Sequence, residues 1–186
     1  MCFHKFSMRF VLSGICLAWS VAQLGAATLS RLTLDDMISQ STAIVRARIT
    51  GSYAAARGPV IYTFYQAQVL SQWKGTSQTV EIAVPGGSVN GLRQDFPGTP
   101  QLTEAKEYLL FLWTSKSGLT QIIGLTQGLF DISQDPNGVS TVSRGATSNT
   151  MLDPRTGQLV KDQAIQMQLT DLSMRIATTL GKGATN

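Results

Sequence analysis

The alternation of apolar and polar positions predicts a chain built mainly from β-strands. Residues 43–50 alternate strictly, with alanine, valine and isoleucine on one face and two arginines on the other. Residues 60–73 continue the alternation, and a strand of this length is expected to bend at a β-bulge. Residues 79–84 form the next predicted strand. The intervening residues 51–59 end in a Gly-Pro pair and are expected to be a loop.

Residues 107–113 form the most apolar run after residue 27, and both faces of this predicted strand are apolar. The faces are Tyr108, Leu110 and Leu112 on one side and Leu109, Phe111 and Trp113 on the other. A strand with two apolar faces must be covered on both sides. We expect the interior of a small β-barrel to cover one face and a helix to cover the other.

Two segments have helical patterns. A short N-terminal helix is expected within residues 30–41, because Thr33 and Asp36 have the spacing of a capping box. A C-terminal amphipathic helix is expected over residues 161–180, followed by Gly181 as its stop. Its apolar stripe is Ile165, Leu169, Leu172, Ile176 and Leu180. Residues 144–160 are polar and irregular and are expected to be a linker.

The first 27 residues are typical of a secretory signal peptide. They begin with basic residues, continue with an apolar run over residues 10–21 and end in Gly25-Ala26-Ala27, so cleavage is expected after Ala27. The run is shorter than the roughly 20 residues that span a membrane. The sequence therefore predicts a secreted or periplasmic protein with no stable membrane insertion after cleavage.

Cleavage after Ala27 would leave 159 of the 186 residues, which suits one domain. It would remove Cys2, Cys16 and His4, the only cysteines and the only histidine. A chain without them has no disulfide, no cysteine or histidine metal ligand, and no base for Ser-His or Cys-His catalysis. Removal of Lys5 and Arg9 lowers the formal net charge from +4 to +2. We predict no enzyme, no cofactor, no metal and no nucleic-acid partner.

Residues 85–106 form the longest loop that is rich in proline and glycine. A loop of this length in a compact domain is usually functional or disordered, and its apolar members indicate that it packs down. We therefore expect it to be the binding surface. The candidate binding residues are Pro85, Gly86, Gly87, Val89, Leu92, Arg93, Phe96, Pro97 and Pro100.

The other groups of residues that could suggest catalysis or calcium binding have structural explanations that we favour. Ser71 and Lys74 have Ser-x-x-Lys spacing, but they lie at a strand end instead of a helix start. Glu104 and Glu107 are expected to be solvated residues beside a strand. Residues 135–138 are typical of a hairpin turn and lack the ligand spacing of a calcium loop.

Aromatic and basic side chains on the strands offer an oligosaccharide-binding face, although core packing is the favoured explanation of the aromatic residues. These residues are Tyr62, Phe64, Tyr65 and Trp73 with Arg46, Arg48, Lys74 and Arg93.

Short motifs along residues 30–133 occur in an order similar to that of the netrin-like domain of tissue inhibitors of metalloproteinases. These motifs are Ala43-Ile44-Val45-Arg46-Ala47, Ile61-Tyr62-Thr63-Phe64, Trp73-Lys74-Gly75 and Glu107-Tyr108-Leu109-Leu110-Phe111. The resemblance implies an OB-type five-stranded barrel. Those inhibitors bind zinc through an N-terminal cysteine and contain disulfides, whereas this chain has no cysteine after residue 16.

The chain also resembles a group of uncharacterised secreted bacterial proteins, some of which are joined to metallopeptidase domains. The motifs that it shares with them are Pro85-Gly86-Gly87, Pro97-Gly98-Thr99-Pro100 and Gly124-Leu125-Thr126-Gln127-Gly128. A peptidase inhibitor or a peptidase-associated domain is the function that the resemblance implies.

We therefore predict a mainly β protein with a small OB-like barrel of five to six strands, a short N-terminal helix and a C-terminal amphipathic helix. The expected organisation is a signal peptide at 1–27, the barrel domain at 28–143, a polar linker at 144–160 and a helix packed on the barrel at 161–180. The predicted function is a secreted, non-enzymatic module that binds an unknown protein partner. A peptidase inhibitor and an oligosaccharide-binding barrel are the two alternatives.

Overall fold

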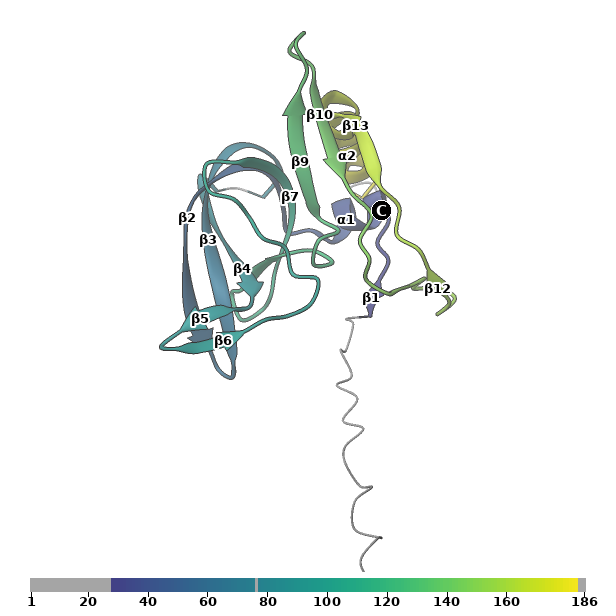
Figure 1. Cartoon of the computed structure of the whole chain (residues 1–186). Helices are drawn as coiled ribbons and strands as arrows, with labels where there is room; N and C mark the ends of the chain where they lie inside the picture. The colour runs from purple at the N-terminus through teal and green to yellow at the C-terminus, as the bar shows by residue number, and fades with distance from the viewer. Residues whose placement is uncertain (1–27, 76, 184–186) are drawn as a thin grey trace, which may run out of the picture.

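The computed structural model describes residues 28–75 and 77–183 (Figure 1). Most of the regular structure is β-strand, and two helices accompany the strands. The prediction of a mainly β protein with an N-terminal and a C-terminal helix is confirmed. The predicted signal peptide, residues 1–27, lies outside the described residues.

The elements follow one another along the chain without an internal repeat. The helices are α1 (Leu34–Gln40) and α2 (Leu169–Gly183). The strands are β1 (Leu29–Ser30), β2 (Ala43–Arg57), β3 (Val60–Lys74), β4 (Thr79–Pro85), β5 (Gly87–Val89), β6 (Leu92–Gln94), β7 (Glu107–Thr114), β8 (Thr120–Ile122), β9 (Leu129–Gln134), β10 (Ser140–Arg144), β11 (Met151–Leu152), β12 (Leu159–Val160) and β13 (Ile165–Gln168).

One large sheet carries the fold. Its strand order is β13-β10-β9-β7-β2-β3-β4, and β8 also pairs with β7. The pairs within this sheet are antiparallel. Two small sheets stand apart from it, the hairpin β5–β6 and the three strands β1-β11-β12.

Strand β7 is where the large sheet divides. One edge of β7 pairs with β2, while the other edge pairs first with β9 and then with β8. The change occurs at Phe111, whose N–H donates to Gly128 O at 2.9 Å and whose carbonyl accepts from Ile123 N at 3.0 Å. A Cβ on Gly128 would lie 2.8 Å from Phe111 O, so glycine permits this close approach.

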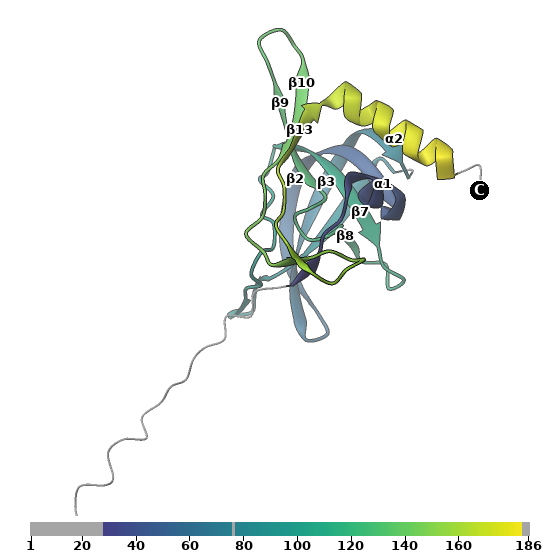
Figure 2. The ribbon, with the colours of Figure 1, turned by 90° about the vertical axis from the view of Figure 1, so that its right-hand side faces the viewer.

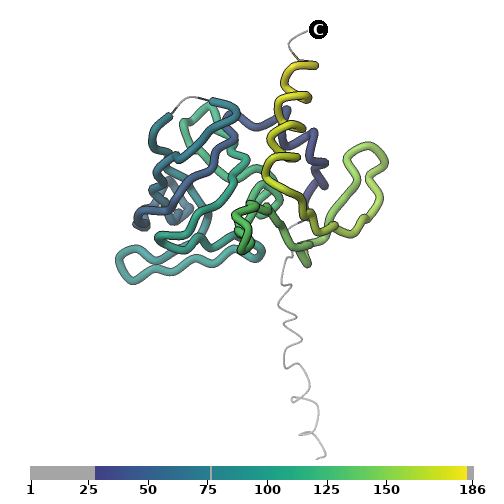
Figure 3. The backbone as a smooth tube through the Cα atoms, turned by 90° about the horizontal axis from the view of Figure 1, so that it is seen from above, coloured from purple at the N-terminus to yellow at the C-terminus, as the bar shows by residue number. Residues whose placement is uncertain are grey.

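Strands β2 and β3 are long and bent. Three register shifts interrupt the β2–β3 pairing, in agreement with the predicted bulges. Strands β2, β3 and β4, which are blue to teal in Figure 3, curl round on one side of α2. The predicted loop at 51–59 is wrong, because β2 continues to Arg57 and only Gly58 and Pro59 form the turn.

The curled part of the sheet is not a closed barrel. Strands β4 and β8 lie near each other, but within the described residues no ladder joins them. The sheet therefore ends at the free edge of β4.

Two hydrophobic clusters lie on opposite faces of β7, as its two apolar faces predicted. Tyr108, Leu110 and Leu112 pack inside the curl with residues of β2, β3 and β4. Leu109 and Phe111 pack on the other face, under the helices. Trp113 was expected to be covered with them, but it is 44% exposed because the helical cover ends at Phe111.

The two helices form the cover of Leu109 and Phe111. They lie side by side on the same side of the sheet, which Figure 2 shows from a second direction. Met37 and Ile38 of α1 and Leu172 and Ile176 of α2 are each at most 1% exposed. The capping box of α1 is present, because Thr33 Oγ1 accepts from the Asp36 N–H.

The predicted helix at 161–180 is wrong in its first part. Residues Ile165–Gln168 form strand β13 on the edge of β10, and α2 begins only at Leu169. Ile165 and Met167 still pack against the helix-side cluster, so an apolar position every second residue replaces the expected helical stripe.

The predicted polar linker at 144–160 contains strands β11 and β12. Met151 in β11 is fully buried, and β11 pairs in parallel with β1. Strands of two residues have no alternation that a sequence pattern can reveal, so they were missed. Neither helix in the described part of the chain has the length and apolarity of a membrane span.

Replacement of the buried Phe111 should lower the free energy of unfolding far more than replacement of the exposed Trp113 on the same face of β7. We expect Phe111→Ala to lower the free energy of unfolding by about 3–5 kcal/mol, because it leaves a cavity beneath the helices. Trp113→Ala is expected to lower it by less than about 1 kcal/mol. Urea unfolding followed by tryptophan fluorescence and circular dichroism measures both, and equal losses would contradict the division of β7 into covered and open positions.

Candidate functional site

The predicted binding loop folds into the hairpin β5–β6, whereas a loop without strands was expected. Its tip is Asn90-Gly91, with φ angles of 51° and 79°. Positive φ at both positions is typical of a type I′ turn, for which Asn-Gly is a preferred pair. The Asn-Gly pair is therefore the sequence signal that indicates this hairpin.

Gln94 clamps the hairpin to the turn between β2 and β3. Its Oε1 accepts from the Ile61 N–H at 2.7 Å, and its Nε2 donates to Pro59 O at 2.9 Å. A single side chain thus satisfies one donor and one acceptor of the neighbouring backbone. This clamp fixes the direction in which the hairpin leaves the sheet.

The Pro-Gly-Gly segment lets the base of the hairpin lie directly on β3. Gly86 donates its N–H to Ile61 O at 2.8 Å and accepts from Thr63 Oγ1 at 2.8 Å. Gly87 has a φ of 138°, and a Cβ there would lie 2.8 Å from Thr63 Oγ1. Both glycines are therefore required by the backbone and the close packing.

The hairpin and the residues after it expose apolar and charged side chains. Leu92 is 69% exposed and Phe96 is 40% exposed. Arg93 and Asp95 form an exposed ion pair with an N–O distance of 2.8 Å. The hydrogen bond from Arg93 holds the pKa of Asp95 below its ordinary value.

A polar hollow of about 410 Å³ lies beside the hairpin. Six of the nine predicted binding residues line it, namely Pro85, Gly86, Gly87, Arg93, Phe96 and Pro100. Val89, Leu92 and Pro97 do not line it. The structure thus brings most of the predicted site together and places Leu92 on the outer surface.

The expectation that the apolar members of the loop pack down holds for Leu102 and is wrong for Leu92 and Phe96, which are exposed. Leu102 is buried in the cluster inside the curl, and the Thr103 N–H donates to Tyr108 Oη at 3.1 Å. Gly98 lies against Asn149, and a Cβ on Gly98 would be 2.5 Å from Asn149 Nδ2. Both ends of the loop are therefore fixed.

The Trp-Lys-Gly segment docks the helices and has no catalytic arrangement. Lys74 Nζ donates to the carbonyls of Ile38 and Ser39 at 3.0 and 2.9 Å, at the end of α1. Trp73 Nε1 donates to Ser173 Oγ in α2 at 3.1 Å. Burial lowers the pKa of Lys74, but its ammonium is committed to the helix carbonyls. The structural explanation of the Ser-x-x-Lys spacing is therefore favoured.

Glu107 forms an ion-pair cluster with two arginines. Arg46 Nη2 lies 2.6 Å from its carboxylate, and Arg48 bonds the other oxygen. Hydrogen bonds from Arg48 and then Arg46 hold the pKa of Glu107 below its ordinary value. Glu104 is exposed. Glu107 is thus a charged partner of β2 and is not poised as a general acid.

The predicted aromatic and basic face does not form as one surface. Tyr65 packs against the cluster inside the curl, and Trp73 packs against the cluster under the helices. Tyr62 and Phe64 remain together, with ring centroids 6.0 Å apart.

Asp135 organises the turn between β9 and β10. Its Oδ1 accepts from the N–H groups of Asn137 and Val139 at 2.9 and 2.8 Å, as expected for a hairpin turn. Within residues 28–75 and 77–183, no group of three or more histidine, cysteine, aspartate and glutamate residues could hold a metal ion.

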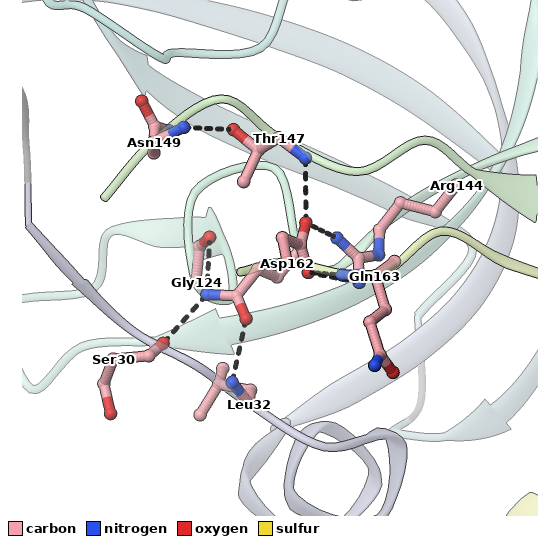
Figure 4. Close-up of polar contacts among 9 residues, drawn as sticks. Ser30, Leu32, Gly124, Arg144, Thr147, Asn149, Asp162 and Gln163 are labelled. Carbon is pink, nitrogen blue, oxygen red and sulfur yellow. Dashed lines mark hydrogen bonds and ion pairs between the residues drawn. The ribbon is translucent and has the colours of Figure 1, made fainter. Parts of the chain in front are cut away.

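Gln127, in the turn before β9, is a buried polar residue that the sequence did not single out for a role. It is fully buried, accepts from the Leu32 N–H at 2.8 Å and donates to Ser30 O at 3.0 Å, two partners that Figure 4 labels. The side chain ties the N-terminal segment to the turn before β9. Its role is therefore structural.

The buried ion pair of Arg144 and Asp162 was also missed by sequence reasoning. The side chains are 5% and 2% exposed, and their closest N–O distance is 2.6 Å (Figure 4). The carboxylate also accepts from the Thr147 N–H at 2.9 Å. Burial alone would raise the pKa of Asp162, but the hydrogen bonds from Arg144 and the backbone outweigh it and lower the pKa.

Comparison of the chain with models of known protein families, with curated proteins and with solved structures finds no match. The function must therefore be inferred from the surfaces that the fold presents.

Removal of the Gln94 clamp should loosen the hairpin locally. We expect Gln94→Ala to speed hydrogen exchange of the Ile61 amide and of the β5–β6 amides, because two hydrogen bonds of about 0.5–1.5 kcal/mol each are lost. Gln101→Ala, in the same loop but outside the clamp, is the control. Unchanged exchange at Ile61 in Gln94→Ala would show that the clamp does not hold the hairpin.

Removal of the buried carboxylate should destabilise the fold in a pH-dependent way. We expect Asp162→Ala to lower the free energy of unfolding by about 3–5 kcal/mol at pH 7, because Arg144 stays buried without its partner. The lowered pKa means that Asp162 stabilises the fold above the ordinary aspartate pKa of about 3.9, and that this stabilisation is lost as the pH falls.

Urea unfolding from pH 7 to pH 3 tests this dependence. The difference between the wild-type protein and Asp162→Ala should shrink at acidic pH. A difference that is constant over this range would contradict the assignment. Asp95→Ala, at the exposed pair, should leave the free energy of unfolding nearly unchanged at each pH.

Proposed function

We propose that this chain is a secreted or periplasmic, non-enzymatic module that binds a protein partner through the hairpin β5–β6. The observation that carries this proposal is Leu92, which is 69% exposed on a hairpin fixed to the sheet by Gln94. An exposed apolar side chain on a fixed support loses little conformational entropy on binding.

The neighbourhood of Leu92 supports the same proposal. Phe96 adds a second exposed apolar side chain, and Arg93 with Asp95 adds a charged pair. Aromatic and arginine side chains near an apolar anchor are typical of binding hot spots. The hollow beside the hairpin, about 410 Å³, could accept a side chain of the partner.

We further propose that the curled part of the sheet is an OB-type barrel left open on one side. The support is the order of its strands. Strand β2 pairs with both β3 and β7, β3 pairs with β4, and β7 pairs with β8. An OB fold is a five-stranded, partly open barrel, and β4 and β8 flank the side without a ladder.

The partner that we propose is a secreted peptidase, which the resemblance to netrin-like inhibitors implies. The absence of a cysteine after residue 16 means that binding would not use the zinc-chelating N-terminus of those inhibitors. The hairpin is the alternative contact. Assays of the protein against secreted metallopeptidases, with thermolysin as the first probe, test this part of the proposal, and activity that is unaffected at high protein concentration would exclude it.

The binding surface itself is tested by a matched pair of positions. We expect a photo-reactive side chain at position 92 to give a discrete cross-linked complex with one exported protein of the producing cells. The same group at Leu159, which is 73% exposed on β12, should give none. Equal cross-linking from both positions, or none from position 92, would overturn the proposal.

A substitution then measures the contribution of the anchor. Leu92→Asp should weaken binding of the identified partner by about 30-fold or more, because a hot-spot residue contributes at least about 2 kcal/mol. Leu159→Asp should leave the affinity unchanged.

A further inference from the structure

The outer face of strands β2, β3 and β4 carries a second candidate surface, away from the hairpin. Phe64, Gln66 and Gln68 of β3 alternate along this face and lie opposite Ala83, Glu81 and Thr79 of β4. Tyr53 of β2 lies opposite Phe64 on the same face. The alternation of the strands thus gathers a ring, amides, a hydroxyl and a carboxylate on one side of the sheet.

Two hollows meet on this face. One of about 370 Å³ lies toward the β7–β8 turn, and one of about 510 Å³ lies over β3 and Thr50 of β2. Both are lined by Thr79, Val80 and Glu81 of β4. The two hollows therefore adjoin each other along β4, with Glu81 in the lining of both, and together they are called the groove.

Tyr53 lines neither hollow, but it bonds Glu81, which lines both, and so supplies a flat apolar surface beside them. Its ring is 46% exposed and stacks on Phe64, with centroids 5.2 Å apart and an angle of 17° between the planes. The hydroxyl donates to Glu81 Oε2 at 2.9 Å. This bond with Glu81 raises the pKa of Tyr53 above its ordinary value. Stacking and the hydrogen bond together hold the ring in a fixed orientation.

Planar polar groups lie along the same face of the sheet and in the lining of the hollows. Gln66 and Gln68 are exposed, and their amides offer both donors and acceptors. Arg57 lines one hollow and has no ion-pair partner in the described part of the chain. The guanidinium of Arg57 offers a fork of N–H donors, and the carboxylate of Glu81 offers two acceptors.

We propose that this groove binds an uncharged linear oligosaccharide. Neighbouring hydroxyls of a sugar ring present donors and acceptors in pairs, which planar amide, carboxylate and guanidinium groups can bond at two points. The ring of Tyr53 matches the apolar C–H face of a pyranose. The groove is open and extends over both hollows, so a chain of sugars fits it better than a single sugar does.

The charges of the groove favour a neutral ligand over a polyanion. Arg57 and Glu81 are its ionisable groups apart from the phenol of Tyr53, and their charges cancel. Nucleic acids and acidic glycans are bound through clusters of lysine and arginine that release counterions. A single arginine beside a glutamate does not form such a cluster.

This inference does not rest on the proposed function, because none of its residues belongs to the hairpin β5–β6. Failure of saccharide binding would leave the protein-binding proposal intact, and the converse also holds. The groove would give the module a second ligand of a different chemical class.

Calorimetric titration of the full chain with cellohexaose, chitohexaose and maltohexaose tests the proposal. We expect at least one of these neutral hexasaccharides to bind with saturation. Tyr53→Ala should weaken that binding by about tenfold or more, because the stacking surface is lost. Tyr53→Phe should keep most of the affinity, since it retains the ring and loses only the bond to Glu81. Leu70→Ala on the same strand, outside both hollows, should change nothing.

Three results would overturn the proposal. They are no binding of any of the three hexasaccharides at millimolar concentration, equal binding by Tyr53→Ala and the wild-type protein, and displacement of the bound sugar by casein peptides or transfer RNA but not by a second neutral glycan. Unfolding curves of each variant ensure that a lost affinity is not a lost fold. Since Tyr53, Glu81 and Leu70 are exposed, all the variants are expected to fold.

Discussion

The structure depends on the burial of β7 on both faces. A strand with five consecutive buried residues is stable only if apolar groups cover it from both sides, and the rest of the chain supplies the two covers. The curled strands β2, β3 and β4 enclose one face, and helices α1 and α2 cover the other. One edge of β7 pairs with β9 before Phe111 and with β8 after it. The curled strands and the strands β9, β10 and β13 are therefore joined at this residue.

The elements that could be predicted from sequence are those whose own residues specify them. Strands β2, β3 and β4 show clear alternation, β7 is a continuous apolar run, and α1 has a capping box. Most of the elements that were missed lack a clear pattern of their own. Strands β11 and β12 are too short to show a period, and β13 resembles the start of a helix because Ile165 precedes Leu169 by four residues. Whether β4 and β8 close a ring depends on the curvature of the sheet, which no local pattern records.

The candidate surfaces were predicted less completely than the fold. The loop that bears the hairpin was recognised from its length and its proline and glycine content. The Gln94 clamp was not recognised, because both of its partners are backbone groups 33 and 35 residues away. The aromatic and basic residues were grouped by type along the strands, and bulges and packing separated them. Tyr53 was missed because residues 51–59 were interpreted as a loop, although the ring belongs to a strand.

Residues of the motifs on which the two resemblances rest have structural roles in this molecule. Trp73 and Lys74 dock the two helices, Gly128 allows the sheet to divide, and Gln127 binds the N-terminal segment. These residues specify the architecture, whereas the exposed side chains of the hairpin and of the outer sheet face lie between them. Proteins that share the motifs could therefore share the scaffold and differ in what they bind.

The attachment of the N-terminal segment has a consequence for the order of folding. Leu32 and Ser30 bond Gln127 across 95 and 97 residues, and β1 pairs with β11 farther along still. Such distant contacts form only after the chain between them has closed into a loop, and closing it has an entropic cost. During synthesis the first described residues therefore cannot pair with Gln127 and β11 until more than half of the chain has left the ribosome. The first described segment is thus among the last to join the structure.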